Sequence, residues 1–243
     1  LGGEPISLTD GLNFGDPTKP KGAHELIETF KGFNKACKVF EIPIISGNAS
    51  LFNEGHNSSI NPTPIIGAMG IMNNKTKIIN KNFINEGDYI GIIGKSLWGT
   101  DNGLSGSEFQ SFFDKTISGE INIDLDFEEK IQKNIRILIK NNLINSATDI
   151  SLGGLIMSLI KSCEKNNLGV NINKSIPENW AGALFGEDQS RIIFSFDPKN
   201  ETLIKESLSN VDWGKIGLVS KENIKFENIL LESDDLFLRY NKG

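Results

Sequence analysis

The stretch that most constrains this chain is Ile44-Ile45-Ser46-Gly47-Asn48-Ala49-Ser50-Leu51-Phe52-Asn53-Glu54. Its apolar start, residues 42–45, predicts the end of a buried strand. The small residues Ser46-Gly47-Asn48 let the backbone approach a ligand closely, and a second short strand is predicted over residues 50–53. Exposed backbone N–H groups can bind a phosphate, and a carboxamide oxygen beside them can bind its Mg²⁺, which takes oxygen ligands. The alternative is a tight turn between two strands that binds nothing.

A second stretch upstream has a similar design. Residues 6–8 predict a short apolar strand that runs into Asp10 and then into a loop of Gly, Asn and Pro over residues 11–17. One strand end then carries a carboxylate and the other a carboxamide. Both could meet at one edge of a sheet, where α/β proteins place ligands. The two stretches together favour a ligand site over a plain turn.

Helices and strands alternate along the rest of the chain, which indicates the α/β or α+β class. Residues 22–40 and residues 126–141 carry apolar side chains at helical spacing, and residues 88–94 predict a buried strand. Ser105 and Ser151 are predicted as the N-caps of two further helices, because each precedes an apolar helical pattern.

Residues 62–71 predict an apolar strand that carries two prolines and two glycines. Proline cannot donate a hydrogen bond in a central ladder, so the end with Pro62 and Pro64 is expected at an edge or rim. Apolar residues occupy both faces of this strand, whereas a half-exposed strand would alternate. We therefore expect another sheet to cover it.

Composition and charge exclude several classes of protein. A net charge of −6 and a pI near 5.1 argue against a nucleic-acid partner or a polybasic membrane patch. No apolar run approaches about 18 residues, the length that a membrane-spanning helix needs. Cys37 and Cys163 lie in apolar helical contexts and are expected to be buried thiols of a reducing compartment, the cytoplasm.

Several well-known catalytic motifs are missing from the sequence. It has no P-loop, no dinucleotide-binding fingerprint and no Gly-x-Ser-x-Gly elbow, which counts against kinase, dehydrogenase and hydrolase functions. What remains is carboxylate, carboxamide, hydroxyl and glycine at predicted strand ends. That set suits a Mg-nucleotide site, where the protein positions groups and stabilises charge.

Five motifs in one order carry a family resemblance. Besides the two stretches above, they are Pro62-Thr63-Pro64-Ile65-Ile66-Gly67, Asp149-Ile150-Ser151-Leu152-Gly153-Gly154-Leu155 and Leu184-Phe185-Gly186-Glu187-Asp188-Gln189-Ser190-Arg191. With them the chain resembles phosphoribosylformylglycinamidine synthase, the ATP-dependent amidine-forming enzyme of purine biosynthesis. The chain begins at Leu1, without a start Met. The resemblance covers roughly the C-terminal third of the synthase chain in this family.

The resemblance implies two parts with a boundary near Asn82, where the composition turns polar over residues 73–85. Residues 1–82 would be the tail of an aminoimidazole-ribonucleotide-synthetase-like N-terminal domain. Residues 83–243 would be its C-terminal α/β domain.

The resemblance also implies roles for individual residues. By position, Asp10 and Gly47 would contact ATP and Asn48 would bind Mg²⁺. Ser50 would contact the substrate. A second group would line a pseudo-symmetric site that holds a structural nucleotide in some members: Asp149, Gly153, Gly154, Glu187 and Gln189. The run Gly186-Glu187-Asp188-Gln189 departs from the commoner Ser-Glu-Ser-Gln, so the role of this loop stays open. The general base of the family lies upstream of Leu1, and no residue of this chain is assigned to it.

The reaction that the resemblance implies is the ATP-driven conversion of formylglycinamide ribonucleotide to its amidine, with ammonia from a glutaminase subunit or domain. The missing N-terminal half of the same protein would cover the strand at residues 62–71, and the chain alone is expected to be inactive. Two alternatives stay open. One is a non-catalytic scaffold that holds a nucleotide for stability. The other is a different ATP-using enzyme of the superfamily, such as a thiamine-monophosphate kinase or a selenide kinase, and the Leu-Asn-Phe-Gly and Gly-Asn-Ala-Ser-Leu blocks count against it.

Overall fold

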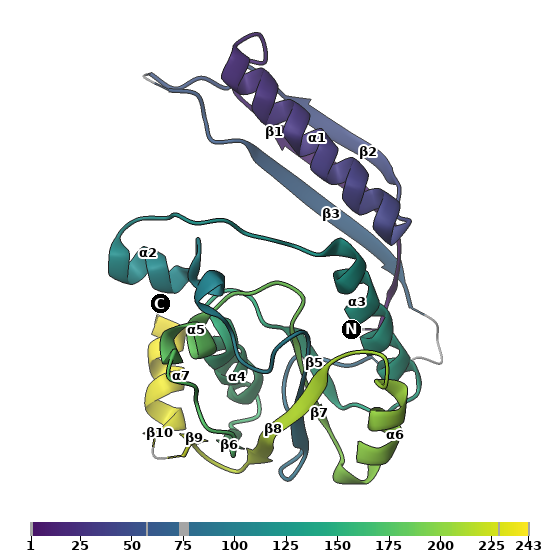
Figure 1. The fold of residues 1–243 in the computed structure, drawn as a ribbon, viewed down its shortest axis with the longest axis vertical. Coiled ribbons are helices and arrows are strands. Elements are labelled where there is room, and N and C mark those ends of the chain that lie inside the picture. The colour runs from purple at the N-terminus through teal and green to yellow at the C-terminus, as the bar shows by residue number, and fades with distance from the viewer. Residues whose placement is uncertain (1, 57, 73–77, 228, 243) are drawn as a thin grey trace. The chain divides into compact units, whose positions relative to one another are not determined.

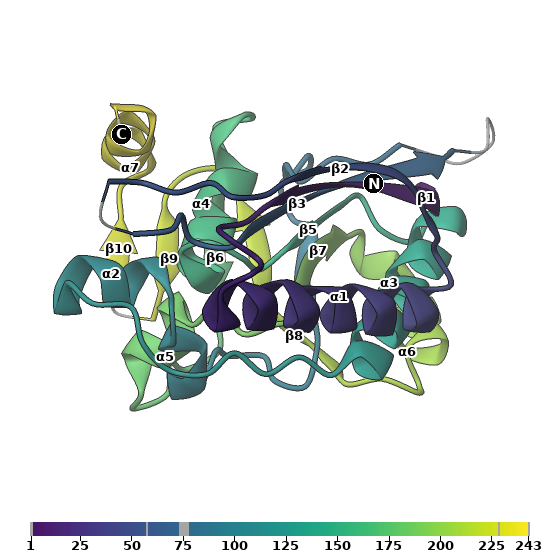
Figure 2. The ribbon, with the colours of Figure 1, turned by 90° about the horizontal axis from the view of Figure 1, so that it is seen from above.

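The structure is a computed structural model that describes residues 2–56, 58–72, 78–227 and 229–242. It divides into two compact units. The N-terminal unit is residues 3–75, and the C-terminal unit is residues 76–243 with the first two residues. Each unit is built on its own sheet, and the mixture of helices and strands confirms the predicted class (Figures 1 and 2). The boundary near Asn82 stays a prediction, and the polar segment behind it begins in residues 73–77, outside the described residues.

The N-terminal unit is a three-stranded sheet with one long helix. It contains β1 (Glu4–Asn13), α1 (Pro20–Phe40), β2 (Ile44–Ser50) and β3 (Thr63–Ile71), and the strand order is β2-β1-β3. β1 pairs parallel with β2 and antiparallel with β3. Two parallel strands need a crossover connection, which α1 provides on one face of the sheet (Figure 2).

Four predictions about this sheet are wrong. The strand end at residues 42–45 is predicted to be buried, but Ile44 and Ile45 are exposed, because β2 is an edge strand. No second strand covers residues 50–53, because β2 ends at Ser50.

The other two wrong predictions concern where the strands end. The sequence predicts that the first strand ends at residue 8 and that the next breaks into a turn at Gly47-Asn48. Both strands instead run on without a break, to Asn13 and to Ser50. The reason is tertiary, because from Thr9 onward β1 and β2 pair residue by residue. This pairing holds glycine and asparagine in a strand that neither favours by itself.

β3 lies at the edge of the sheet, as its prolines predict. All of its residues are exposed. The exposed fractions of Ile65, Met69 and Ile71 are 61%, 62% and 60%, and that of Ile66 is 43%. Large apolar side chains in this density are unusual on an open surface.

The C-terminal unit is a seven-stranded sheet with helices on both faces (Figure 1). Its strands are β4 (Tyr89–Ile93), β5 (Ser146–Asp149), β6 (Gly169–Ile172), β7 (Ile192–Phe196), β8 (Trp213–Ser220), β9 (Ile224–Phe226) and β10 (Ile229–Leu231), in the order β10-β9-β6-β8-β4-β7-β5. Its α-helices are α2 (Glu108–Asp114), α3 (Leu125–Lys140), α4 (Gly154–Glu164), α5 (Trp180–Phe185), α6 (Glu201–Ser207) and α7 (Ser233–Lys242), and its 3-10 helices are η1 (Asp101–Leu104) and η2 (Pro198–Asn200). The β6–β9 pair is parallel and the other pairs are antiparallel.

Alternation along the central strands sends apolar side chains to both faces of this sheet. On β4, Ile90 and Ile92 pack in the core that contains residues of α4 and α7. Ile93, on the same strand, packs in the core that contains residues of α3 and α6. All three side chains have no exposed surface. A strand covered on both faces reads as a continuous apolar run, which is why residues 88–94 were predictable.

The predicted N-cap of α2 at Ser105 is wrong. The helix begins two residues later, and the hydroxyl of Ser107 accepts the hydrogen bond from the N–H of Gln110. The same hydroxyl and the N–H of Ser107 both donate to the carbonyl of Leu104, the last residue of η1. This turn after η1 moves the start of the helix past Ser105.

The predicted N-cap of α4 at Ser151 is also wrong, because the N-cap is Gly153. Gly153 and Gly154 have φ angles of 83° and 68°, in the left-handed region that favours glycine. The chain therefore enters α4 through a glycine turn, and Ser151 contributes its carbonyl to this turn by accepting the N–H of Gly154.

The two cysteines differ. Cys163 on α4 is fully buried, as predicted, and burial raises the pKa of its thiol to about 12. The prediction is wrong for Cys37, which is only half-buried, because α1 is poorly covered and Gly22 is its one buried residue among those described. Within the described part of the chain, no helix is both long and apolar enough to cross a membrane.

Candidate functional site

β1 and β2 bring the two predicted ligand stretches together. In their parallel register, Asp10 lies opposite Gly47 and Asn13 lies opposite Ser50. A Cβ on Gly47 would lie 1.6 Å from Oδ1 of Asp10. Only glycine at this position leaves room for the carboxylate beside β2. The two stretches therefore meet in mid-strand and not at strand ends.

The side chains of Asp10 and Asn48 leave opposite faces of the sheet. The hydroxyls of Thr9 and Ser46 form a hydrogen bond of 3.0 Å, so these two residues share one face and Asp10 lies on the other. Side chains alternate along a strand, which puts Asn48 and then Ser50 on the face of Thr9 and Ser46. The sheet thus separates the carboxylate from the carboxamide, while the carboxamide and the serine hydroxyl share a face.

The two faces offer different chemistry. Asp10 lines a hollow of about 540 Å³ together with Leu12, Phe30 of α1 and residues 44–49 of β2, which include Asn48. The other face carries what we call the polar row: Thr9, Ser46, Asn48, Asn13 and Ser50. Within the described residues, no hydrogen-bond partner is found for the carboxamide of Asn48. Amide and hydroxyl oxygens of this kind are ligands that suit Mg²⁺ and its bound phosphates.

A charged cluster ties the segment after β2 to the segment after β1. Oε1 of Glu54 accepts hydrogen bonds from the N–H of Asp16 at 2.9 Å and the hydroxyl of Ser59 at 3.0 Å. Lys19 Nζ lies 3.3 Å from the same oxygen. The Ser59 hydroxyl, followed by the Asp16 N–H, lowers the pKa of Glu54, and the Thr18 side chain lowers the pKa of Asp16. Both carboxylates are therefore charged at neutral pH and hold this connection in place.

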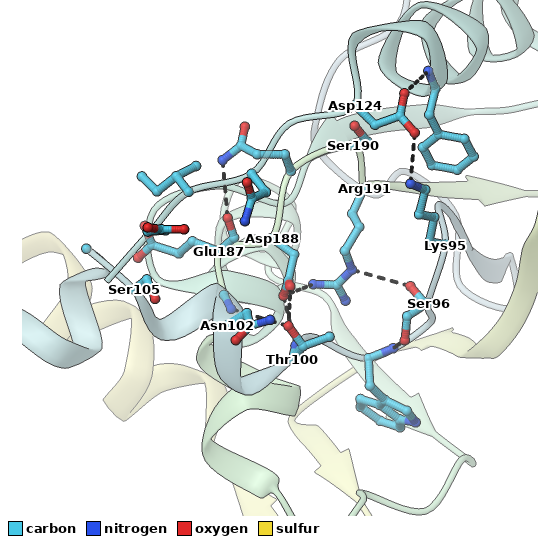
Figure 3. Close-up of a pocket in the computed structure, with 18 residues that line it drawn as sticks. Lys95, Ser96, Thr100, Asn102, Ser105, Asp124, Glu187, Asp188, Ser190 and Arg191 are labelled. Atoms are coloured by element: carbon cyan, nitrogen blue, oxygen red, sulfur yellow. Dashed lines mark hydrogen bonds and ion pairs between the residues drawn. The ribbon is translucent and has the colours of Figure 1, made fainter. Parts of the chain in front are cut away.

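The C-terminal unit contains a pocket of about 300 Å³ (Figure 3). Its walls come from the loop after β4, the segment before α3 and the loop before β7. Polar groups that line it include Lys95, Asn102, Glu187 and Gln189. Lys95 is held at one side by an ion pair of 3.0 Å with Asp124.

Glu187 binds the backbone of its own unit. Its Oε1 accepts the N–H of Gly153 and the N–H of Glu108, each at 2.9 Å. Gly153 is the N-cap of α4, and Glu108 is the first residue of α2. One carboxylate oxygen therefore satisfies orphan N–H groups at the starts of two helices.

Asp188 and Arg191 hold the two main loops of the pocket together. Asp188 accepts the N–H of Thr100 at 2.8 Å and its hydroxyl at 2.5 Å. Arg191 is 4% exposed and donates from Nη2 to the carbonyl of Leu97, while its Nη1 lies 4.0 Å from Oδ2 of Asp188. Burial lowers the pKa of Arg191 to about 10, an effect that Asp188 opposes, so the guanidinium stays charged at neutral pH. Figure 3 shows this guanidinium between Asp188 and Ser96.

The five residues implied for the pseudo-symmetric site do not form one cluster. Glu187 meets Gly153, and Glu187 and Gln189 line the pocket. A Cβ on Gly154 would lie 2.6 Å from the backbone of Phe185, so this glycine allows close packing of α4 against α5. Asp149 is the exposed last residue of the edge strand β5 and lies outside the pocket lining.

The sequence alone indicates no role for Thr100, Asp188 or Arg191. A signal exists for Arg191, because it directly precedes the apolar strand β7, and a charged residue beside such a run is seldom buried unless it is paired. Thr100 carries no comparable signal, since its partner lies 88 positions away in the sequence.

Comparison with known protein families finds a match for each of the two parts of the chain. Residues 1–72 match the family described as AIR synthase related protein, N-terminal domain, and residues 85–227 match AIR synthase related protein, C-terminal domain. The chain belongs to the AIR synthase related proteins.

Its relatives confirm the resemblance read from the motifs. The phosphoribosylformylglycinamidine synthase subunit PurL of Leuconostoc mesenteroides is 37% identical over 224 residues, which are 91% of this chain and 29% of that protein. The subunit of the same name from Prochlorococcus marinus is 33% identical over 253 residues, with 99% of this chain and 31% of that protein covered. The chain thus spans less than a third of the curated relatives that it matches.

A solved structure shows the same fold. T. maritima PurL complexed with FGAR has a TM-score of 0.76 and 18% sequence identity, and the match covers 98% of this chain and 40% of that one. The same protein has also been solved with ATP and as PurLQS, with TM-scores of 0.70 and 0.69.

The pairing of Asp10 with Gly47 predicts the effect of one added methyl group. Gly47→Ala should lower the free energy of unfolding of the N-terminal unit by about 1–3 kcal/mol, the usual cost of overpacking. Gly11→Ala is the matched control on the neighbouring strand, because its Cβ would make an ordinary contact of 3.8 Å with Ile65. Calorimetric unfolding of both variants provides the measurement. Equal stability of the two variants would contradict the assigned register.

The bonds of Glu187 predict a structural role for its carboxylate. Glu187→Ala should destabilise the C-terminal unit by about 1.5–3 kcal/mol, because two N–H groups lose a charged acceptor. Trp98, Trp180 and Trp213 all lie in this unit, so tryptophan fluorescence during urea unfolding reports on it alone. Gln189→Ala, on the same loop but exposed, should change stability by less than about 0.5 kcal/mol. An unfolding midpoint of Glu187→Ala equal to that of the control would refute this role.

Proposed function

We propose that this chain is the C-terminal portion of a cytoplasmic, ATP-dependent carbon–nitrogen ligase that converts formylglycinamide ribonucleotide to its amidine in purine biosynthesis. The nitrogen would arrive as ammonia from a glutaminase subunit or domain. The observation that carries the proposal is that both parts of the chain match one family in order, with relatives named for this synthase at 32–37% identity.

The polar row fits the Mg-nucleotide that this reaction requires. In the proposal, the carboxamide oxygen of Asn48 binds Mg²⁺ and the hydroxyl of Ser50 contacts the substrate from the same face. Asp10 and Gly47 would contribute to ATP binding from the centre of the β1–β2 pair. When bound, ATP supplies the phosphoryl group that activates the amide oxygen of the substrate for displacement by ammonia.

The residues of this chain would act by position and charge. A strand pair fixes the backbone of Asn48 and Ser50, so their oxygens need little rearrangement as charge develops, which is the main source of such catalysis. No side chain of the polar row is a strong base, and we propose that the general base lies in a part of the natural protein upstream of Leu1.

For the second group, we propose a role in a pseudo-symmetric site and not in the chemistry. Glu187 supports this view, because its Oε1 already accepts two backbone N–H groups. Gly153 and Gly154 would shape the start of α4, while Asp149 and Gln189 stay available to a ligand on exposed positions.

Asn48→Ala in the natural protein tests the hypothesis that Asn48 takes part in catalysis. We expect kcat/KM with ATP and the substrate to fall. The transition-state stabilisation calculated from it should drop by about 2–3 kcal/mol, the scale for one preorganised polar group. Asn34→Ala, an exposed asparagine of α1, is the control and should leave the rate unchanged. Unchanged kcat with a lower melting temperature for Asn48→Ala would favour the non-catalytic scaffold instead.

We further propose that the missing N-terminal half of the natural protein covers β3. The support is the exposed apolar surface of this strand, with Ile65, Met69 and Ile71 on one face and Ile66 on the other. A bare edge strand of this kind tends to pair with another copy of itself.

The chain expressed alone should therefore self-associate. Light scattering over a concentration series should show dimers or larger species, and Ile66→Lys should reduce them. Ile137→Lys on α3 is a control of similar exposure, 46% against 43%, and should not change the association. A monomeric chain that Ile66→Lys leaves unaltered in solubility and stability would show that β3 is not an interface.

A further inference from the structure

We propose that Asn53 is a positioning residue that fixes the hydroxyl of Ser50. The inference rests on the proposed function, which gives Ser50 a contact with the substrate, and it adds a residue to which no role has been assigned. Asn53 itself would not touch the substrate, because its carboxamide is committed to the ends of β1 and β2.

The carboxamide of Asn53 contacts Ser50 three times. Its Nδ2 donates to the carbonyl of Ser50 at 2.9 Å and to the hydroxyl of Ser50 at 3.1 Å. The hydroxyl of Ser50 in turn donates to Oδ1 of Asn53 at 3.2 Å. A serine hydroxyl otherwise rotates freely among its staggered positions. With both a donor and an acceptor on Asn53, this hydroxyl has one preferred direction.

Asn53 also anchors the end of β2 to the end of β1. Its Nδ2 also lies 3.0 Å from the carbonyl of Phe14, so its two hydrogens are shared among this carbonyl and the two oxygens of Ser50. The backbone N–H of Asn53 donates to the same carbonyl of Phe14 at 3.1 Å. Phe14 has no exposed surface, so this carbonyl belongs to a buried residue of the N-terminal unit. Asn53 thereby fixes the position of the Ser50 hydroxyl relative to the end of β1 as well as to its own strand, β2.

The turn that carries Asn53 is strained. Phe52 has a φ of 60°, a left-handed conformation that is rare for a bulky aromatic residue. Such a conformation persists only where the surroundings hold it, and it concentrates at functional sites. Here the bonds of Asn53 on one side and the bond from the N–H of Phe52 to the carbonyl of Gly15 on the other hold it. The strain is explained if the turn serves to place Asn53 against Ser50.

A double-mutant cycle in the natural protein tests the inference. Ser50→Ala, Asn53→Ala and the double variant are assayed with ammonium as the nitrogen source, and KM is measured separately for formylglycinamide ribonucleotide and for ATP. Asn53→Ala should raise the KM for the substrate about 10-fold, the scale of one or two lost hydrogen bonds. The KM for ATP should change less than about 2-fold, a split that general loss of stability would not produce.

The coupling between the two residues gives the decisive result. In the Ser50→Ala background, Asn53→Ala should add less than about 2-fold, because Asn53 acts through the missing hydroxyl. Effects that multiply would overturn the inference. If Ser50→Ala alone leaves the substrate KM unchanged, the substrate role of Ser50 fails, and the positioning role fails with it. Asn53→Ser is the milder variant should Asn53→Ala not fold, and Asn34→Ala on α1 is the matched control.

Discussion

The parallel pairing of β1 with β2 is the interaction on which the candidate site depends. It joins two segments that lie more than 30 positions apart, places Asp10 beside Gly47, and aligns Asn48 and Ser50 on the opposite face. The pairing requires both a crossover helix, which α1 supplies, and a residue without a side chain at position 47. Every proposed contact with a nucleotide or substrate in the N-terminal unit follows from this register.

Glu187 and Asn48 are used in contrasting ways, although Glu54 and Asn53 of the N-terminal unit also bind backbone groups. In the C-terminal unit, Glu187 and Asp188 accept backbone N–H groups, and Arg191 donates to backbone carbonyls, so the pocket loops are fastened by their own charges. In the N-terminal unit, the carboxamide of Asn48 has no partner among the described residues. A polar group without a partner on a regular strand is free to bind a ligand, whereas a carboxylate that caps two helices is engaged in stability. This contrast supports the proposal that the chemistry lies on the polar row, and it supports a structural role for Glu187.

Much of the fold could be predicted from sequence because it depends on periodic burial. The helix α3 and the strand β4 each have a regular apolar pattern, lie where that pattern predicts and bury those side chains. The helix α1 also lies where its pattern predicts, although Gly22 is its one buried residue among those described. The strand character of Gly47 and Asn48 could not be predicted in this way, because it comes from pairing with a distant strand and not from local preference. The same holds for Asp188 and Thr100, whose hydrogen bond joins loops 88 positions apart. The opposite directions of Asp10 and Asn48 follow only once the register is known.

Hydrogen exchange of the natural protein, with and without Mg²⁺ and a non-hydrolysable ATP analogue, tests most directly whether the nucleotide site lies on the β1–β2 pair. If the site lies there, the ligand should slow exchange in peptides that cover residues 8–14 and 44–53. Residues 95–106 and 186–191 of the C-terminal pocket report separately on the second group, and slower exchange there alone would not meet this prediction. Protection confined to that pocket, with unchanged exchange in β1 and β2, would contradict the account.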